Sequence, residues 1–219
     1  MQVKQMAPRR IGRPDAQASE ALSRHILGTA TRLFIEQGYA ATSIEQVALV
    51  AGSSKATIYR RYSSKEDLFA EVIKDITAVI LETAVAAERA EKNASDPLAT
   101  LREVSRAFLE LAVRQEAIAV YRVLIAESPR FPEMVHRVME AVGVPLEAVY
   151  LRLLNAARDT GQIRRDCPAE VQHRLLDGLI TGWAVRESLL GRNVLTSKDE
   201  RDAFFNSAWT IFLNGVTHI

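Results

Sequence analysis

The sequence has little capacity for covalent cross-linking or membrane insertion. Its 219 residues include a single cysteine, Cys167, which excludes an internal disulfide and favours a reducing compartment. A membrane-spanning helix needs about 18 consecutive apolar residues, and no such run is present. The N-terminus also lacks the apolar segment of a signal peptide. We therefore expect a cytoplasmic protein that does not contact a membrane.

The sequence also lacks the residue patterns of common catalytic and metal sites. It contains no glycine-rich phosphate loop and no nucleophile elbow. The four histidines are scattered without the spacing of metal ligands: His25, His136, His173 and His218. We therefore expect neither an enzyme nor a bound metal or cofactor.

Strand-like alternation is absent as well, and apolar residues recur at helical spacing. We expect an all-α fold of about nine helices, two of them short. The longer helices are predicted over Ser19–Gln37, Lys65–Ala90, Leu98–Gln115, Glu116–Glu127, Pro132–Thr160, Ala169–Leu190 and Lys198–Val216. Pro145 removes a helix hydrogen bond and predicts a break or kink near Gly143–Pro145.

Charge is distributed unevenly, although the net formal charge is only +1. Residues 1–65 contain ten Lys or Arg and four Asp or Glu, a net charge of +6. The remaining 154 residues contain 18 basic and 23 acidic side chains, a net charge of −5. This asymmetry predicts a polyanion-binding surface near the N-terminus.

Residues 1–18 have the composition of a flexible basic arm, with two prolines and a glycine that oppose helix formation. Its arginines Arg9, Arg10 and Arg13 suit the narrow, electronegative minor groove of DNA. A solubilising tail explains the same composition, so both interpretations fit the sequence.

The segment TSIEQVALVAGSSKATIYRRYSSK, residues 42–65, combines helix caps, a turn signal and positive charge. Thr42 and Glu45, three residues apart, form the pattern of a capping box. Gly52 supplies the left-handed conformation that ends a helix and turns the chain. Two short helices joined in this way form a helix-turn-helix motif, predicted over residues 43–62.

The second short helix is predicted over Lys55–Tyr62, with Ser53 or Ser54 as its cap. Its buried side would consist of Ala56, Ile58 and Tyr59. Its outward side would consist of Lys55, Thr57, Arg60 and Arg61. Cations and hydroxyls in this arrangement suit phosphates and base edges of DNA. The alternative is a helical hairpin with solvated cations, which requires the caps, turn and charges to coincide by chance.

The run AGSSKATIYRRYSSKEDLF, together with the preceding LFIEQGYAATSIEQVA, resembles the helix-turn-helix signature of the tetracycline-repressor (TetR) family of bacterial regulators. This specific resemblance covers about the first third of the chain. It implies an all-helical homodimeric repressor with an N-terminal DNA-binding domain and a C-terminal domain for ligand binding and dimerisation. Ala56 departs from the family, which often has Gly or Pro there. The turn ESPRFPEM resembles the AcrR-like branch.

The resemblance also implies which residues contact double-stranded DNA. The expected contacts are Thr42, Ser54, Lys55, Thr57, Tyr59, Arg60, Arg61 and Lys65. Base edges would be met by Lys55 and Thr57, the DNA backbone by Tyr59 and Arg61, and phosphates by Thr42 and Lys65. The implied domains are the arm 1–18, the DNA-binding domain 19–65 and the C-terminal domain 66–219.

A homodimer is expected because the two half-sites of a pseudo-palindrome require two DNA-binding heads. The last two predicted helices carry more apolar residues than a single core-facing stripe needs. The candidate interface residues are Leu176, Leu179, Ile180, Phe205, Ala208, Trp209 and Phe212. They would form a four-helix bundle between subunits. The alternative is that they pack within one subunit.

A ligand cavity is expected among the helices between Leu98 and Trp183. The candidate lining residues are Phe108, Tyr121, Phe131, Met134, Tyr150, Asn155 and Trp183. Aromatic and methionine side chains also fill ordinary cores, so each has a plain packing interpretation. The scarcity of polar groups in these segments favours a small hydrophobic effector.

The sequence therefore predicts a ligand-responsive repressor that leaves a pseudo-palindromic operator when an effector binds. An activator, or a regulator without a ligand, fits the same motifs. A helical enzyme or carrier with a vestigial head is the alternative from another class. The basic residues Lys55, Arg60, Arg61 and Lys65 argue against it, because such a protein has no need of them.

Overall fold

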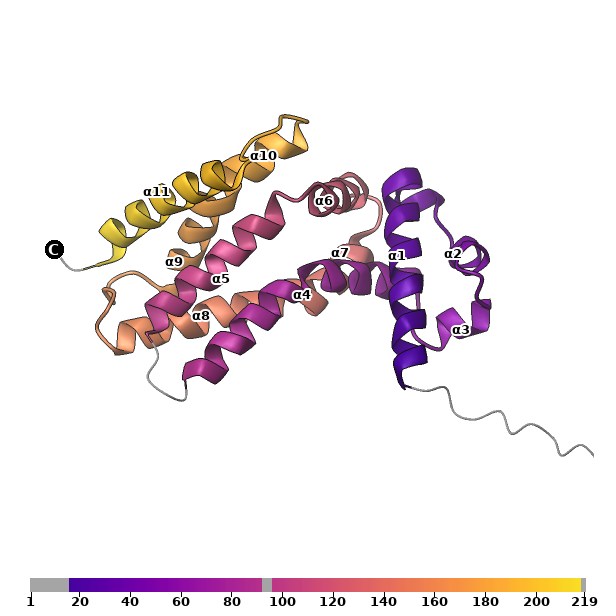
Figure 1. The fold of residues 1–219 in the computed structure, drawn as a ribbon, viewed down its shortest axis with the longest axis horizontal. Coiled ribbons are helices and arrows are strands. Elements are labelled where there is room, and N and C mark those ends of the chain that lie inside the picture. The colour runs from indigo at the N-terminus through magenta and orange to yellow at the C-terminus, as the bar shows by residue number, and fades with distance from the viewer. Residues whose placement is uncertain (1–15, 92–95, 218–219) are drawn as a thin grey trace, which may run out of the picture.

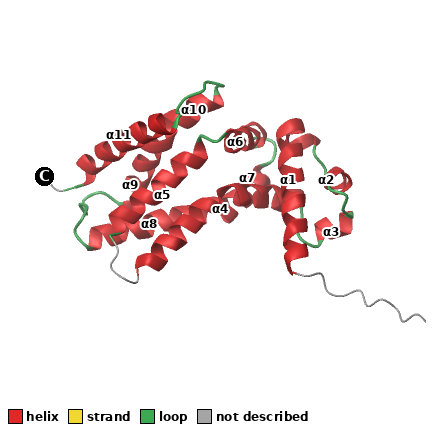
Figure 2. Ribbon diagram, viewed as in Figure 1, coloured by secondary structure: helices red, strands yellow, loops and turns green. Residues whose placement is uncertain are grey.

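The computed structural model describes residues 16–91 and 96–217, and all regular secondary structure within these ranges is helical (Figure 2). The predicted all-α fold is therefore confirmed. The α-helices are α1 (Ala16–Ala41), α2 (Ile44–Val50), α3 (Lys55–Tyr59), α4 (Lys65–Glu91), α5 (Pro97–Ala112), α6 (Gln115–Glu127), α7 (Pro132–Val138), α8 (Val144–Asp159), α9 (Ala169–Asp177), α10 (Trp183–Leu189) and α11 (Lys198–Val216). No helix in these ranges is both long and apolar enough to cross a bilayer.

Two π-helical turns join neighbouring α-helices without a break: η1 (Met139–Gly143) and η2 (Gly178–Gly182). The first links α7 to α8, and the second links α9 to α10. With each linked pair counted once, the described residues form nine helices, as the sequence predicts.

The predicted break near Pro145 is replaced by the turn η1. Pro145 lies in the first turn of α8, directly after η1. A π-helical turn accommodates a missing backbone N–H by changing the hydrogen-bond register, so the helix continues. The turn η2 has no counterpart in the sequence predictions.

The first helix differs slightly from its prediction. It begins at Ala16 rather than Ser19, so the helix includes part of the predicted arm. Gly38 has non-helical torsion angles, with φ at 83°, and ends the regular part of the helix as expected.

The helices are arranged as a head and a body (Figure 1). Helices α1, α2 and α3 form one end of the molecule, and α4 runs from this end into the body. Helices α6 and α7 lie between the head and the rest, contacting α1 and α4 respectively. The far end consists of α5, α8, α9 and α11.

Two apolar cores correspond to these parts. One surrounds Phe34 of α1 and Phe69 of α4 and includes Met134 and Val138 from α7. We call it the head core. The other lies between α5, α8 and the last helices, with Phe205 fully buried in it. The head core therefore extends beyond α1–α4 into the body.

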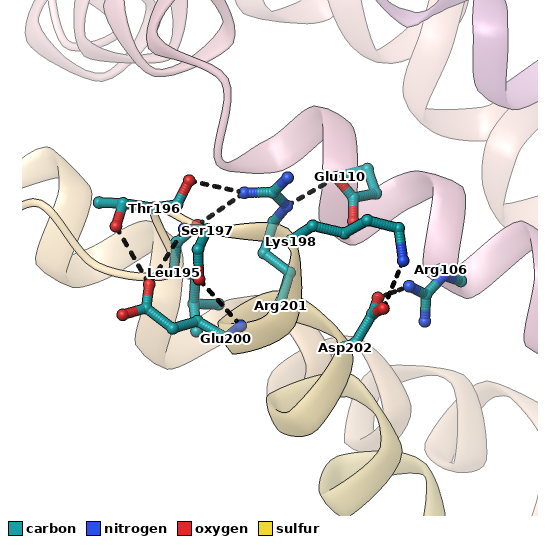
Figure 3. A network of polar contacts seen from close by, with 9 residues as sticks. All are labelled: Arg106, Glu110, Leu195, Thr196, Ser197, Lys198, Glu200, Arg201 and Asp202. Atoms are coloured by element: carbon teal, nitrogen blue, oxygen red, sulfur yellow. Dashed lines mark hydrogen bonds and ion pairs between the residues drawn. The ribbon is translucent and has the colours of Figure 1, made fainter.

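A polar network fixes the start of α11 to α5 (Figure 3). Arg201 donates from Nε to the Glu110 carboxylate at 2.7 Å, and from Nη1 to the carbonyl oxygens of Leu195 and Thr196 at 3.0 Å. Arg106 on α5 pairs with Asp202. This network adds polar contacts to the apolar packing between α11 and the body, and Arg106 also lies 5.4 Å from the centre of the Phe205 ring.

Most of the residues expected at the dimer interface are buried inside the subunit instead. These are Leu176, Ile180, Phe205, Ala208, Trp209 and Phe212. Leu179 is partly buried against the same core. The apolar residues that these helices expose include Val171, Leu175, Trp183 and Ile211. Helical spacing could not decide which of two adjacent apolar stripes faces inward.

The burial of Trp209 predicts a large loss of stability on truncation. Trp209→Ala should lower the free energy of unfolding by about 3–5 kcal/mol, because it removes buried apolar surface and leaves a cavity. Thr210→Ala, at the exposed next position, should change it by less than about 0.5 kcal/mol. Denaturant unfolding of both variants measures the difference. Equal free energies of unfolding for the two variants would place Trp209 outside the core.

Candidate functional site

Helices α2 and α3 and the turn between them form the predicted helix-turn-helix motif. The cap of α2 is Ser43, whose Oγ accepts a hydrogen bond from the Gln46 amide at 3.1 Å. The prediction of Thr42 as this cap is therefore wrong by one residue. At the other end of α2, Gly52 adopts φ of 59°, as expected. The Ser53 amide donates to the Ala48 carbonyl at 2.9 Å, which completes a Schellman motif.

Helix α3 is capped by Ser54, one of the two predicted caps. The Ser54 Oγ accepts from the Thr57 amide at 3.1 Å and contacts the Thr57 hydroxyl at 2.8 Å. The helix ends at Tyr59, earlier than predicted, and Ile58 is its only buried residue. Ala56 and Tyr59, expected on the buried side, are exposed.

The exposed face of α3 presents positive charge and hydroxyl groups together. Lys55, Tyr59 and Arg60 are all exposed, and Thr57 is partly exposed. The Lys55 ammonium lies 5.6 Å from the centre of the Tyr59 ring and pairs with Glu45 on α2. The hydrogen bond to Glu45 raises the pKa of Lys55, so its positive charge is secure at neutral pH. This face can donate hydrogen bonds to an anionic or base-like partner.

Arg61 takes a different position from the other cations of the motif. Its guanidinium donates to Ser23 Oγ at 2.7 Å and to Ser19 Oγ at 2.9 Å. Both serines belong to α1, so Arg61 ties the end of the motif to the first helix. Its expected DNA contact requires part of this network to open.

Thr42 and Lys65, the expected phosphate contacts, are engaged inside the protein. Thr42 is 1% exposed, and its hydroxyl donates to the carbonyl oxygens of Leu33 and Gly38. Lys65 donates from Nζ to the carbonyl oxygens of Tyr39 at 2.8 Å and Thr42 at 3.0 Å. Both side chains therefore stabilise the corner between α1 and α2, a role that follows from tertiary contacts and not from local sequence.

The environment of Lys65 combines burial with aromatic contact. Its ammonium lies 4.2 Å from the centre of the Tyr39 ring and 5.7 Å from that of Phe131. Burial lowers the pKa of Lys65, whereas the nearby Glu66 and Glu127 carboxylates raise it. Tyr39 also donates its hydroxyl to Glu66 at 2.8 Å. This cluster joins α1, α4 and α7, and we call it the Lys65 corner.

Helix α6 reaches the same corner through its last residue. Glu127 accepts a weak hydrogen bond from the Ala40 amide at 3.4 Å. It also lies close to Gly38, where an added Cβ would sit 3.6 Å from the Glu127 carboxylate. Nothing in the local sequence of Glu127 indicates this contact, because its partner lies 87 residues away along the chain.

The predicted arginine contacts of the arm, Arg9, Arg10 and Arg13, lie outside the described residues. Within the described ranges, no group of three or more His, Cys, Asp or Glu residues could hold a metal ion.

An apolar cavity of about 670 Å³ lies in the body between α4, α5, α6 and the helix formed by α9, η2 and α10. Of the residues predicted to line a ligand site, Phe108 and Tyr121 lie in the wall of this cavity. Ile73 and Ile76 contribute from α4, and Leu124 contributes from α6. The cavity volume lies within the range typical of drug-sized ligands.

The other predicted lining residues lie elsewhere. Phe131 and Met134 belong to the head core, and Tyr150 belongs to the body core. Asn155 is exposed and accepts a hydrogen bond from Arg158, and Trp183 packs on Phe204 at the surface. Aromatic and methionine side chains like these are common in pocket walls, but the tertiary packing of this protein places them away from the cavity.

Comparison with protein families finds two matches that follow one another along the chain. The family described as bacterial regulatory proteins, tetR family, matches residues 26–72. The AefR-like transcriptional repressor C-terminal domain matches residues 99–215. Together, the two matches include the helix-turn-helix motif and most of the body.

Among characterised relatives, the transcriptional regulator AcrR of Shigella flexneri is 35% identical over 106 residues. This match covers 48% of the present chain and 48% of AcrR, so it spans about half of either protein. The transcriptional repressor AcnR of Corynebacterium efficiens is 28% identical over 163 residues, covering 74% of this chain and 80% of AcnR.

Solved structures show the same fold. A TetR-family transcriptional regulator from Mesorhizobium loti superimposes with a TM-score of 0.73 at 23% identity, covering 91% of this chain and 98% of the other. FadR of Thermus thermophilus, a repressor solved in complex with lauroyl-CoA, superimposes with a TM-score of 0.59 at 21% identity, covering 88% and 94%.

The contacts of Lys65 predict a structural role that can be separated from DNA binding. Lys65→Met should lower the free energy of unfolding by about 1.5–3 kcal/mol, because charge-assisted hydrogen bonds to two carbonyl groups are lost. Lys55→Met, on the exposed face of α3, should leave the free energy of unfolding nearly unchanged, because its ion pair with Glu45 is exposed to solvent. Thermal or urea unfolding without DNA checks both values. If Lys65→Met were as stable as the wild-type protein, the Lys65 ammonium would contribute nothing to the stability of the corner.

Proposed function

The chain belongs to the TetR family of bacterial transcriptional regulators, and we propose that it is a repressor that binds a pseudo-palindromic operator as a homodimer. A small, mainly hydrophobic effector would release it from the operator. The observation that carries this proposal is the exposed basic face of α3, presented by a capped helix-turn-helix motif. We also propose the division into an arm (1–18), a head (19–65) and a body (66–219), and a cytoplasmic location.

The proposed DNA contacts are made by the side chains of α3 that are exposed to solvent. Lys55 and Thr57 would reach base edges in the major groove, while Tyr59 and Arg60 would contact the sugar-phosphate backbone. Ser54 would orient the start of α3. Engagement of DNA would transfer Lys55 from Glu45 to its base partner. The arginines of the arm would enter an adjacent minor groove.

Three further residues that were expected to contact DNA would instead support the DNA-binding helix from inside the head. Arg61 would hold α3 against α1 through its serine contacts. Thr42 and Lys65 would fix the corner that orients α2. They would determine the angle at which the recognition helix meets the groove.

The proposed dimer is supported by exposed apolar side chains on the last helices. Leu175 and Ile211 are each 59% exposed, on α9 and α11. The rings of Trp183 and Phe204 lie 5.4 Å apart and connect α10 to α11 at the surface. A two-fold interface of these helices would form a four-helix bundle and place two heads on one face of DNA.

The proposed effector site is the 670 Å³ cavity. FadR of Thermus thermophilus was solved in complex with lauroyl-CoA, and another structural neighbour, FrrA, is a flavonoid-responsive regulator. Both regulators share the fold with this chain and respond to, or bind, ligands with large apolar parts. The predominantly apolar wall of the cavity here suits a ligand of that general kind.

The release mechanism would use the two helices that both line the cavity and reach the Lys65 corner. Helix α4 provides Ile73 and Ile76 to the cavity and begins at Lys65. Helix α6 provides Tyr121 and Leu124, and ends at Glu127 beside the α1–α2 corner. A ligand that separates these helices would reorient both heads and favour a spacing that mismatches the grooves.

Selection of random duplex DNA by the purified protein tests the operator proposal. We expect one pseudo-palindrome to be enriched, with half-sites about 34–36 Å apart or a multiple of it. Its affinity should fall steeply as the salt concentration rises. Failure to enrich any sequence, with weak binding even at low salt, would contradict the proposal.

Lys55→Met tests the role of α3 directly. It should weaken binding to the selected operator about 5–150-fold, because a base contact is worth about 1–3 kcal/mol. Lys74→Met, an exposed lysine on α4 outside the motif, is the matched control and should leave the affinity unchanged. Fluorescence anisotropy with labelled operator measures both. Equal affinities of the two variants would exclude Lys55 from the interface.

Leu175→Glu tests the dimer surface. The introduced charge should shift the protein to monomers in sedimentation velocity, because a buried unpaired carboxylate is costly at an interface. Val144→Glu alters an apolar residue of nearly equal exposure, 58%, on α8 and should leave the dimer intact. Dimers of unchanged stability in Leu175→Glu would move the interface elsewhere.

A further inference from the structure

The helix-turn-helix motif, residues 43–62, contains one acidic side chain among three basic ones. This residue is Glu45, which lies in the first turn of α2 and forms an ion pair with Lys55, the first residue of α3. The side chains of Lys55 and Glu45 are 53% and 58% exposed. The carboxylate therefore lies beside the exposed basic face of α3 that would meet DNA.

The cap of α2 does not account for Glu45. The capping hydrogen bond joins the Gln46 amide to Ser43 Oγ, so Gln46 occupies the position that a capping box requires. The hydrogen bond from Lys55 lowers the pKa of the Glu45 carboxyl, with smaller contributions from its own backbone amide and from Ser43. The carboxylate is therefore charged at neutral pH, and its exposed oxygens can accept further hydrogen bonds.

A carboxylate on this face opposes DNA binding in general. DNA phosphates repel it, and its pairing with Lys55 withholds one cation from non-specific phosphate contacts. Against a base edge, it also loses water, which costs free energy unless the base donates a hydrogen bond. Glu45 therefore disfavours most sequences, and only a base with a suitable donor removes the cost.

Cytosine is the base whose major-groove edge matches a carboxylate. It presents the N4 amino group as a donor, whereas guanine presents two acceptors and thymine an acceptor and a methyl group. Adenine places the acceptor N7 next to its N6 amino group, and a carboxylate can only accept. The Lys55 ammonium can only donate, which suits the guanine acceptors O6 and N7.

The contact between the two side chains limits how far apart their bases can be. Glu45 and Lys55 meet at their charged ends, and neighbouring bases of a strand lie about 3.4 Å apart along the helix axis. The two side chains can therefore address the same base pair or two adjacent base pairs. On binding, each member of the ion pair exchanges its partner for a base edge, so neither charge is left without a partner.

We propose that Glu45 is a specificity-determining residue, whose carboxylate accepts a hydrogen bond from the N4 amino group of a cytosine in each half-site. This cytosine lies in the same base pair as the guanine contacted by Lys55, or in the adjacent one. The inference rests on the proposed function, because it assigns a base preference to the proposed operator. It adds a base-reading residue from α2 to the contacts made by α3.

Parallel selections of random duplex DNA with the wild-type protein and Glu45→Gln test this assignment. Glutamine has nearly the same shape but both donates and accepts, so it can pair with N6 and N7 of adenine. One position in each half-site should change from cytosine towards adenine. The ratio of affinities for operators with cytosine and adenine there should fall at least about 5-fold. Glu36→Gln removes an exposed carboxylate of α1 and should select the wild-type sequence.

A third selection, with Lys55→Met, locates the guanine. The position at which Lys55→Met loses its base preference should coincide with the cytosine position or be its neighbour, because the two side chains are in contact. A separation of two or more base pairs would overturn the shared contact and with it the inference.

Binding to an unrelated duplex measures the general cost of the carboxylate. In Glu45→Gln, Lys55 is free to neutralise a phosphate. The slope of log affinity against log salt concentration should therefore steepen by about 0.9 for each head that contacts DNA. Glu36→Gln should retain the wild-type slope. A wild-type slope for Glu45→Gln would show that Glu45 imposes no such cost and would overturn the inference.

The outcomes separate this inference from the proposed function. An operator enriched equally by the wild-type protein and Glu45→Gln would leave the repressor proposal standing and reject base reading by Glu45. A preference weakened at every position of the half-site would also reject it, because Glu45 would then only stabilise α2 or position α3. Failure of the wild-type protein to enrich any sequence would reject both proposals. Circular dichroism establishes that each variant is folded.

Discussion

The ammonium group of Lys65 holds together the corner on which the orientation of the head depends. It binds the backbone carbonyl groups of Tyr39 and Thr42 and lies against two aromatic rings. Backbone carbonyl groups at a chain reversal need hydrogen-bond partners when water is excluded. Because Lys65 is also the first residue of α4, a single side chain connects the end of α1, the start of α2 and the helix that enters the body.

The Lys65 corner lies between the two candidate sites, the helix-turn-helix motif and the cavity in the body. The cavity lies in the body, yet α4 and α6 each run from its wall to the corner. The head core supports the same connection, because Met134 and Val138 of α7 pack into it. Closely packed interfaces shift between discrete arrangements and do not deform smoothly. A ligand in the cavity would therefore act on the heads by displacing whole helices.

Local features of the fold could be predicted from the sequence, because caps and turns depend on a few neighbouring residues. Ser54, Gly52 and the boundaries of α11 are examples. Features that depend on tertiary packing could not. Thr42 has the residue type of a cap or phosphate contact, but the fold buries its hydroxyl. Trp209 lies on a helix with two apolar stripes, and only the packed structure shows which one faces inward.

The most direct test of the account is the distance between the two heads of the proposed dimer. Glu36→Cys in a Cys167→Ser background provides one exposed labelling site per subunit on α1, outside the proposed DNA contacts, and pulsed electron paramagnetic resonance measures the separation of two spin labels. We expect a narrow distribution on the operator, consistent with recognition helices about 34–36 Å apart, and a shifted one when ligand fills the cavity. An identical distribution with and without a ligand that releases the operator would contradict the account.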